Sequence, residues 1–518
     1  RSTAGRQLMA AGRLPWLASL VLLQLPRRPS ADSPEGYSCG LVVDAGSTGS
    51  RLSVFAWPAS LRAESFHQFQ EVLVDPEPTL EKKFSAQITW RDGRFVTEPG
   101  LSAFTEDLRS PVEAAQQLEL LTEAALRHAV PAVPGGCREV EVLVRATGGL
   151  RHARQERPEA TDELLRTLRE HFREKLQLRS SVSIMSGQDE AFFAYLSVNH
   201  AAGNLATGVR EGVMDIGGST MQIAFSVEHS NANSYKRAFR LLGPSEAVYL
   251  RSFLGCGGDN VVAESMSRVI RASAGDEMQG EENIRYVHPC FNRGFEGEVA
   301  SEGEPGGVVR WTGSGDVERC KELIEEMLAT GGCSAPADMP ALSGKLRGMS
   351  FLTFIAIDLG LMQRHEEREM TGQQLSDRAM DFCRMSFEEA VTESIARKGV
   401  SRTARQEQFV RDLCLLGLYF PRLLESFGVH SPETVTLGTK VSGKTADWTL
   451  GVMLDTLTER LHAEGSNLTL TTTVGEEKVS EGPSWTNAVM ITSAVVLASS
   501  FWGVCIFGKS RTPATGCT

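Results

Sequence analysis

The chain has 518 residues, of which 41% are hydrophobic and 23% are charged, as in ordinary globular proteins. This length is enough for two or three domains with a substantial core. The formal net charge of −12, with no basic stripe, excludes nucleic acid as an expected partner. An acidic protein that binds an anion must concentrate positive potential locally, through loop amides, a few arginines and a bound cation.

The N-terminal residues 1–31 have the pattern of a secretory signal peptide. Arg6 and Arg13 precede an apolar run over 14–25, and residues 29–31 offer a cleavage region. An uncleaved anchor is the alternative, but the run is short for a membrane span.

A strand, a small-residue turn and a second strand follow, between Leu41 and Trp57. Asp44 ends the first apolar run, and a turn of glycine, serine and threonine follows it. Such a turn directs several backbone N–H groups at one anion. The same pattern returns between Val213 and Phe225, which places Asp215 in the position of Asp44. The repeat predicts two halves of similar build, each with a phosphate-binding hairpin.

The segments between and after the hairpins alternate between strand and helix patterns, which predicts an α/β fold in two lobes. Ser110 and Glu113 predict a capped helix start. Helices are expected at 110–129, 161–177, 191–198, 321–328, 351–363 and 406–427, with a last helix beginning at Asp447, and strands at 140–144 and 181–185. The Gly-, Glu- and Ser-rich segment 272–315 is expected to form long surface loops.

Residues 488–507 contain no charged residue and have the length of a membrane span. Lys509 and Arg511 follow, so the tail 508–518 is expected in the cytoplasm. A polar stalk, 464–487, precedes the span and carries the glycosylation sequon at Asn467. The catalytic lobes are then lumenal or extracellular, at the Golgi or the cell surface.

Five short motifs, in order, resemble those of the apyrases, the nucleoside triphosphate diphosphohydrolase family. They are Asp44–Arg51, Ala146–Arg151, Ser186–Glu190, Asp215–Gln222 and Ser252–Gly257, and the stretch Asp447–Gly451 is also similar. The resemblance implies two ribonuclease H-like lobes of the actin and sugar-kinase type around a central cleft. Lobe I would comprise 37–186 and the return segment 441–463, and lobe II would comprise 187–440.

The resemblance implies stepwise removal of terminal phosphates from nucleoside tri- or diphosphates with Ca²⁺ or Mg²⁺. A Golgi-type nucleoside diphosphatase and a catalytically inactive nucleotide-binding ectodomain are the alternatives. The expected partners are a nucleotide of the ATP/ADP or UDP/GDP type and a membrane, through one C-terminal span. The nucleobase preference and a homo-oligomer stay open.

Roles for individual residues follow from the resemblance and from the chemistry of phosphoanhydride hydrolysis, which needs charge neutralisation, an in-line water and a base. Asp44 and Asp215 are expected to hold the metal, through water. Glu190 is expected to be the general base, although a solvated surface Glu is the commoner fate. Thr147, Thr220 and Gln222 are expected to orient the water or the phosphate. Two groups of residues are expected to bind the phosphates: Ser47, Thr48, Gly49 and Ser50 in the first hairpin, and Gly217, Gly218 and Ser219 in the second.

Some positions depart from the family pattern or stay ambiguous. A His is frequent in the family's surface branch where Gly49 stands here. Arg145 and Arg151 flank the second motif, either as phosphate ligands or as solvated side chains. Phe354 lies where the family stacks the nucleobase, but we expect it in the core, because the neighbouring Ile355 and Ala356 cannot stack as Tyr does.

Eight of the ten cysteines lie before the expected span, and spacing alone allows 105 pairings. Cys290 and Cys320 resemble one pair that the family bridges, and Cys383 and Cys414 resemble a later pair. The resemblance leaves Cys256 either free or bonded to Cys333. In the chain-entropy model, loops of these sizes contribute about 3 to 4 kcal/mol each.

Overall fold

The computed structural model describes residues 36–463 except 61–68, 75–77, 79, 81–87, 107–109, 228–235, 240–245, 274–284 and 301–307. The expected signal peptide, stalk, membrane span and tail therefore lie outside the described residues. Within the described part of the chain, no helix is both long and apolar enough to cross a membrane.

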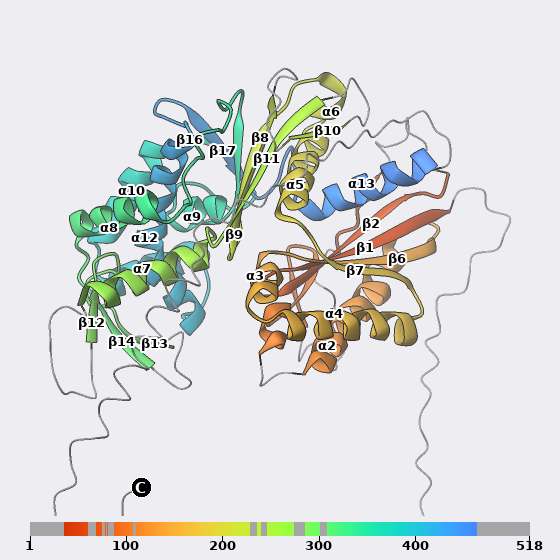
Figure 1. Cartoon of the computed structure of the whole chain (residues 1–518), viewed down its shortest axis with the longest axis horizontal. Helices are drawn as coiled ribbons and strands as arrows, with labels where there is room; N and C mark the ends of the chain where they lie inside the picture. The colour runs from red at the N-terminus through yellow and green to blue at the C-terminus, as the bar shows by residue number, and fades with distance from the viewer. Residues whose placement is uncertain are drawn as a thin grey trace, which may run out of the picture.

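The first lobe is built on a mixed sheet in which β1 is antiparallel to β2 and parallel to β6 (Figure 1). In pairing order the strands are β4 (Ile88–Arg91), β5 (Arg94–Thr97), β2 (Ser50–Pro58), β1 (Tyr37–Ala45), β6 (Cys137–Ala146) and β7 (Arg179–Ile184), with β3 (Gln70–Glu71) on β2. Side chains of β1 alternate between the faces of the sheet. Leu41 and Val43 join the core cluster of α2 (Pro111–His128) and α4 (Pro158–His171), whereas Val42 joins a different cluster. Burial on both faces explains the unbroken apolar run in the sequence.

The helices of this lobe are α2 (Pro111–His128), α3 (Gly148–Glu156) and α4 (Pro158–His171), with a π-helical turn over Phe172–Leu176 and 3-10 helices at Leu101–Thr105 and Val130–Ala132. The Ser110 hydroxyl caps α2 by accepting a hydrogen bond from the Val112 N–H at 3.2 Å. The predicted helix of 110–129 is confirmed to within one residue at either end, as the capping signal and amphipathic spacing require.

The second lobe repeats this pairing, with β8 antiparallel to β9 and parallel to β15. Its sheet runs β10 (Lys236–Phe239), β11 (Glu246–Leu254), β9 (Thr220–Val227), β8 (Gly212–Ile216), β15 (Leu346–Ser350), β17 (Thr434–Gly438) and β16 (Glu367–Thr371). Its helices are α6 (Asn204–Thr207), α7 (Gly258–Ser273), α8 (Val317–Thr330), α9 (Phe351–Asp358), α10 (Gly372–Arg384), α11 (Phe387–Lys398) and α12 (Ala404–Ser426). The predicted mixed α/β class is confirmed.

Two helices, α5 (Gly187–Ala201) and α13 (Trp448–Ala463), lie between the two sheets (Figure 1). They pack against each other, α5 also packs against β8, β9 and β11, and α13 packs against β1 and β2. One hydrophobic cluster accordingly includes Val42 and Phe55 of the first sheet together with Val213 and Leu250 of the second. This shared core joins the lobes.

The contact between α5 and α13 depends on a glycine. A Cβ atom at Gly451 would lie 2.1 Å from the carbonyl oxygen of Phe193, so only glycine allows the two backbones to approach this closely. The Gly451 N–H donates to the Ser197 hydroxyl at 2.8 Å, and that hydroxyl donates to the Asp447 carbonyl. The polar contact fixes the register of the two helices.

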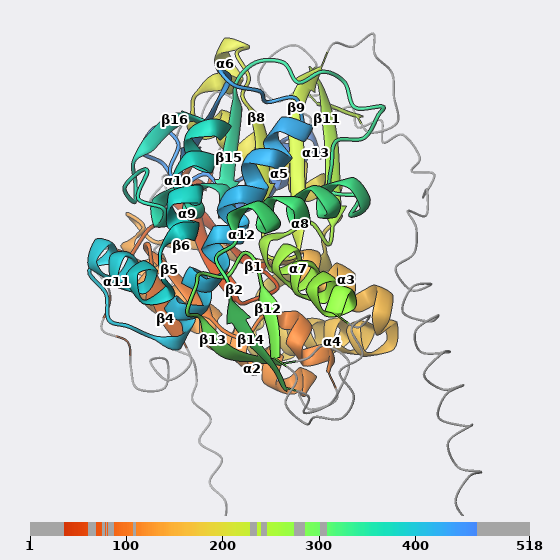
Figure 2. The ribbon, with the colours of Figure 1, turned by 90° about the vertical axis from the view of Figure 1, so that its left-hand side faces the viewer.

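The prediction of long surface loops over 272–315 is wrong in part. A three-stranded sheet forms there from β12 (Arg285–His288), β14 (Val308–Gly313) and β13 (Glu296–Ala300), beside α7 (Figure 2). Phe291, Phe295 and Trp311 form a small hydrophobic core against it. Long-range pairing and these aromatic contacts stabilise strands in a segment whose composition suggests loops.

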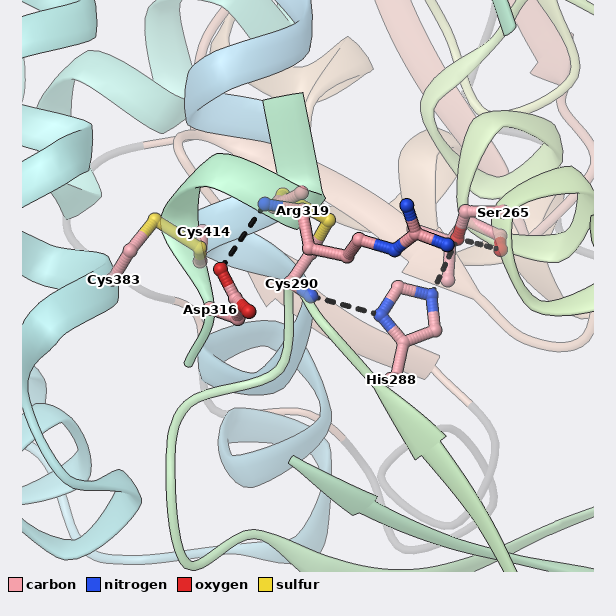
Figure 3. The surroundings of a disulfide bond; sticks show 9 residues. Ser265, His288, Cys290, Asp316, Arg319, Cys383 and Cys414 are labelled. Atoms are coloured by element: carbon pink, nitrogen blue, oxygen red, sulfur yellow. Dashed lines mark hydrogen bonds between the residues drawn. A yellow bond between two sulfur atoms is a disulfide. The ribbon is translucent and has the colours of Figure 1, made fainter. Parts of the chain in front are cut away.

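Four disulfides join the eight cysteines. Cys290–Cys320, Cys383–Cys414 and Cys256–Cys333 match the pairings considered from the family resemblance, and Cys39–Cys137 joins β1 to β6 in the first lobe. The first two bonds are fully buried and lie close together (Figure 3). Beside them, His288 Nδ1 accepts from the Cys290 N–H at 3.2 Å and His288 Nε2 contacts the Ser265 hydroxyl at 3.1 Å. Burial lowers the pKa of His288 to about 3, so this histidine is neutral.

Replacing the glycine at the helix crossing should destabilise the protein. In Gly451→Ala the new methyl group overlaps the Phe193 carbonyl, and overpacking of this kind costs about 1 to 3 kcal/mol of unfolding free energy. Gly372→Ala is the matched control, because the nearest atoms to its new methyl group lie 3.8 Å away. Chemical denaturation of both variants measures the difference, and equal stabilities would contradict the proposed tight crossing.

Candidate functional site

The first predicted phosphate hairpin connects β1 to β2 as a tight turn. The Gly46 N–H donates to the Gly49 carbonyl at 3.0 Å, which closes the turn directly after Asp44. Thr48 is exposed and Ser47 and Gly49 are half-buried, so this turn presents small polar groups at its surface. A Cβ at Gly49 would lie 2.7 Å from the Thr97 carbonyl oxygen. In this chain the neighbouring strand therefore favours glycine at the position where the surface branch of the family often has His.

Ser50 differs from the rest of the first hairpin. It begins β2, is 1% exposed, and its hydroxyl oxygen has no hydrogen-bond partner among the described residues. The hydroxyl is therefore buried in this conformation, as are the side chains of Thr147 and Thr220, and the phosphate-binding role of Ser50 stays a prediction.

The second hairpin connects β8 to β9 with the same geometry. The Gly217 N–H donates to the Thr220 carbonyl at 2.9 Å, and Gly217, Gly218 and Ser219 are half-buried. The segment before α7 is held against this turn, since the Gly255 N–H donates to the Ser219 carbonyl at 2.9 Å. The fifth motif therefore supports the fourth.

The two hairpins lie next to each other. A Cβ at Gly218 would be 2.8 Å from the Ser47 hydroxyl of the first turn and 2.3 Å from a carboxylate oxygen of Asp259. A Cβ at Gly149 would be 2.9 Å from the Ser47 Cα. Motifs far apart in the sequence thus meet through residues without side chains, which lets the backbone N–H groups of both turns approach one region.

Thr147 and Thr220 lie in two motifs that meet at the junction of the lobes. The Thr147 N–H donates to the Ala45 carbonyl at 3.3 Å, which attaches the second motif to the first. Thr220 lies against the second motif, because a Cβ at Gly148 would be 2.4 Å from its methyl group. Both threonines are buried, at 7% and 3% exposure.

Glu190 lies in the first turn of α5 and is only 6% exposed, so it is not a solvated surface residue. Its Oε2 atom accepts from Arg151 Nη2 at 2.7 Å and from Gln222 Nε2 at 3.0 Å. Gln222 also donates to the hydroxyls of Thr220 at 2.8 Å and Ser252 at 3.2 Å. The predicted residues Glu190, Thr220 and Gln222 therefore form one hydrogen-bonded group.

Acidic groups are concentrated around the hairpins. The pKa of Asp44 is raised to about 7, chiefly by burial; Arg51 opposes the rise, and the charges of Asp447, Glu190 and Asp215 contribute to it. Burial also raises the pKa of Asp215, against a hydrogen bond from Ser350. These carboxylates repel one another, so their ionised forms need a compensating positive charge.

Asp447 belongs to a separate ion triad with Arg94 and Glu71. Arg94 donates to the Asp447 carboxylate and to the Glu71 carboxylate, the latter at 2.6 Å. Although burial opposes it, the Arg94 guanidinium lowers the pKa of Asp447, which keeps this carboxylate ionised. Thr449 adds a backbone N–H bond at 2.9 Å. The sequence indicated this stretch only as a family resemblance, without a role for Asp447.

The structure resolves three positions that the sequence left ambiguous or predicted wrongly. Arg145 donates to the Ser181 carbonyl at 3.1 Å and to the Val144 carbonyl at 3.2 Å, so it stabilises the edge of the sheet. Arg151 is neither solvated nor free, since it pairs with Glu190. Phe354 is 40% exposed, which contradicts its predicted place in the core. The buried side of α9 is made by other residues, including Ile355 and Ala356 at 2% and 0% exposure.

The chemistry of the donors fits a hard divalent cation. Asp44 and Asp215 offer only oxygen ligands, and the Asp215 Oδ1 atom is buried without a hydrogen-bond partner in the described structure. Among the described residues, no group of three or more His, Cys, Asp or Glu side chains is arranged to hold a metal ion. The remaining ligands would then be water or substrate oxygens, as is usual for Mg²⁺.

Comparison with known proteins finds relatives that cover most of this chain. Mouse (Mus musculus) ectonucleoside triphosphate diphosphohydrolase 1 is 25% identical over 491 residues, which cover 86% of each chain. The bovine (Bos taurus) ectonucleoside triphosphate diphosphohydrolase 8 is 24% identical over 471 residues, with 83% of this chain and 84% of the relative covered.

A solved structure from Neospora caninum, described as nucleoside triphosphate hydrolases, shares the fold with a TM-score of 0.53 and 16% identity. The match covers 83% of this chain and 94% of that chain. The GDA1/CD39 (nucleoside phosphatase) family matches residues 30–469, which is most of the sequence. The chain therefore belongs to the GDA1/CD39 nucleoside phosphatase family.

Proposed function

We propose that this protein hydrolyses the terminal phosphates of nucleoside tri- and diphosphates with a water molecule that Glu190 activates, and that a divalent cation is required. The observation that carries the proposal is the hydrogen-bonded group of Glu190, Gln222 and Thr220 beside two adjacent glycine-rich turns. A carboxylate next to a phosphate-binding region is the arrangement that general-base attack on a phosphorus atom needs.

The chain's own residues have distinct roles in this proposal. The backbone N–H groups and hydroxyls of Ser47, Thr48 and Gly49 bind the terminal phosphate. The turn of Gly217, Gly218 and Ser219 binds the adjacent phosphate or the side from which water attacks. Glu190 removes a proton from the water. Thr147, Thr220 and Gln222 orient that water or the phosphate. Positioning and charge compensation, rather than covalent chemistry, supply most of the rate enhancement.

Asp44 and Asp215 are the residues that would hold the cation, Ca²⁺ or Mg²⁺, in part through water. When bound, the ion neutralises phosphate charge and compensates the repulsion among the buried carboxylates. The raised pKa of Asp44 and the unpartnered oxygen of Asp215 support this assignment.

We infer further that both lobes are ribonuclease H-like, which the repeated strand order supports, since a central strand is antiparallel to one neighbour and parallel to the other in each sheet. The proposed lobe boundaries are 37–186 and 187–440, with 441–463 returning to lobe I. We propose that residues 488–507 anchor these lobes to the lumenal or extracellular face of a membrane.

Glu190→Gln should reduce turnover by about 10²- to 10⁴-fold, because the amide keeps the shape of the side chain but cannot accept the proton. Nucleotide binding should persist. Phosphate release and equilibrium nucleotide binding measure the two effects. Glu113→Gln is the matched control, since it makes the same change at an exposed position in the first turn of α2. Near-normal turnover in Glu190→Gln would remove Glu190 from the mechanism.

Removal of divalent ions should abolish phosphate release, and either Ca²⁺ or Mg²⁺ should restore it. Asp44→Ala and Asp215→Ala should raise the cation concentration needed for half-maximal rate or eliminate turnover. Titration of cation against rate in chelator-treated protein makes this measurement. Full activity in excess chelator would contradict the metal assignment.

Gly218→Ala should lower kcat/KM, because its methyl group would overlap Asp259 and crowd the Ser47 hydroxyl of the opposite turn. The unfolding free energy should change little compared with its effect on activity, since the displaced groups lie at the surface of the hairpins. Steady-state kinetics and chemical denaturation test the two parts. Unchanged kcat/KM would show that the spacing of the turns does not matter for catalysis.

A further inference from the structure

Glu190 forms an ion pair with Arg151, which the sequence analysis did not predict. Arg151 reaches Glu190 from α3 in the first lobe, and its Nη2 atom lies 2.7 Å from Oε2. Its Nη1 atom donates to the Met185 carbonyl at 2.9 Å, and Nη2 lies 3.5 Å from the Thr220 hydroxyl. The planar guanidinium is therefore held at three points, with its side chain 15% exposed.

Both donors to Glu190 contact the same oxygen. Arg151 and Gln222 each donate to Oε2, while no described residue donates a hydrogen bond to Oε1. A carboxylate oxygen that already accepts two hydrogen bonds, one of them from a cation, is a weaker proton acceptor. The other oxygen keeps its lone pairs for water.

The charges around Glu190 make this pairing necessary. Burial raises the pKa of Glu190 above its ordinary value; Arg151 opposes this rise and Asp215 on β8 adds to it. The ionised form of Asp44 on β1 also repels Glu190. Gln222 on β9 and Ser252 on β11 are neutral, and Asp189 on the same helix binds the Ser186 hydroxyl at 2.7 Å. Arg151 is thus the cation that pairs directly with Glu190 in the described structure.

We propose that Arg151 is a positioning residue for the hydrolysis: its ion pair fixes Oε2 of Glu190, so that Oε1 accepts the proton of the attacking water. The inference rests on the proposed function, in which Glu190 is the base. In this proposal Arg151 binds the carboxylate of Glu190 and does not bind a phosphate of the substrate.

Arg151→Met tests this proposal because it removes the charge and the hydrogen bonds but keeps much of the apolar side chain. Without the cation, the pKa of Glu190 rises, so protonation inactivates the base at higher pH. The acidic limb of kcat/KM against pH should move upward by about one to three pH units. At neutral pH kcat should fall at least tenfold, with KM changed by less than a factor of three.

Two matched variants separate this role from a structural one. Arg151→Lys keeps the positive charge and should return the acidic limb to within about half a pH unit of the wild type, although its kcat stays lower because lysine lacks the planar fork. Arg145→Met removes a partly buried arginine that flanks the same motif but binds backbone carbonyls, and it should leave the acidic limb unchanged.

The outcomes distinguish failure of this inference from failure of the proposed function. A wild-type protein without nucleotide phosphatase activity, or a fully active Glu190→Gln, would overturn the function. With that function intact, an unshifted acidic limb in Arg151→Met would overturn the positioning role. A large rise in KM at constant kcat would do the same, because it would place Arg151 on the substrate.

Discussion

The close packing of α5 against α13 is the constraint on which the rest of the structure depends. Gly451 lies against the backbone of Phe193, and Ser197 links both helices by hydrogen bonds. Because α5 packs on one sheet and α13 on the other, this contact fixes the orientation of the lobes. It also fixes Glu190, which lies in the first turn of α5, relative to residues of both lobes.

Glycines, which have no side chain, form the closest contacts in the site. Gly148, Gly149 and Gly218 each contact a residue of another motif so closely that a methyl group would overlap it. Such contacts bring backbone N–H groups of both turns together without intervening side chains. The sequence pattern associates these glycines with phosphate binding. The close approach of the two lobes is a second physical reason why glycine is needed at these positions.

The same region concentrates negative charge, and arginines compensate it locally. Arg94 is paired with Asp447 and Glu71, and Arg151 is paired with Glu190. Burying a charged carboxylate without a partner is costly, so each of these arginines offsets part of that cost close to the hairpins. A protein with a net charge of −12 can thus present a site for an anionic substrate.

Local patterns in the sequence determined much of this protein: the apolar run ending at Asp44, its repeat at Asp215, and most of the predicted helices, because capping residues and hydrophobic periodicity act over a few neighbours. They did not predict the three-stranded sheet over 285–313, whose pairing is partly long-range, or the exposure of Phe354. The partner of Glu190 was equally undetermined, because Arg151 is 39 residues away and only the tertiary structure brings the two side chains together. Residue types and spacing therefore indicated the chemistry, whereas long-range packing decided which charges meet.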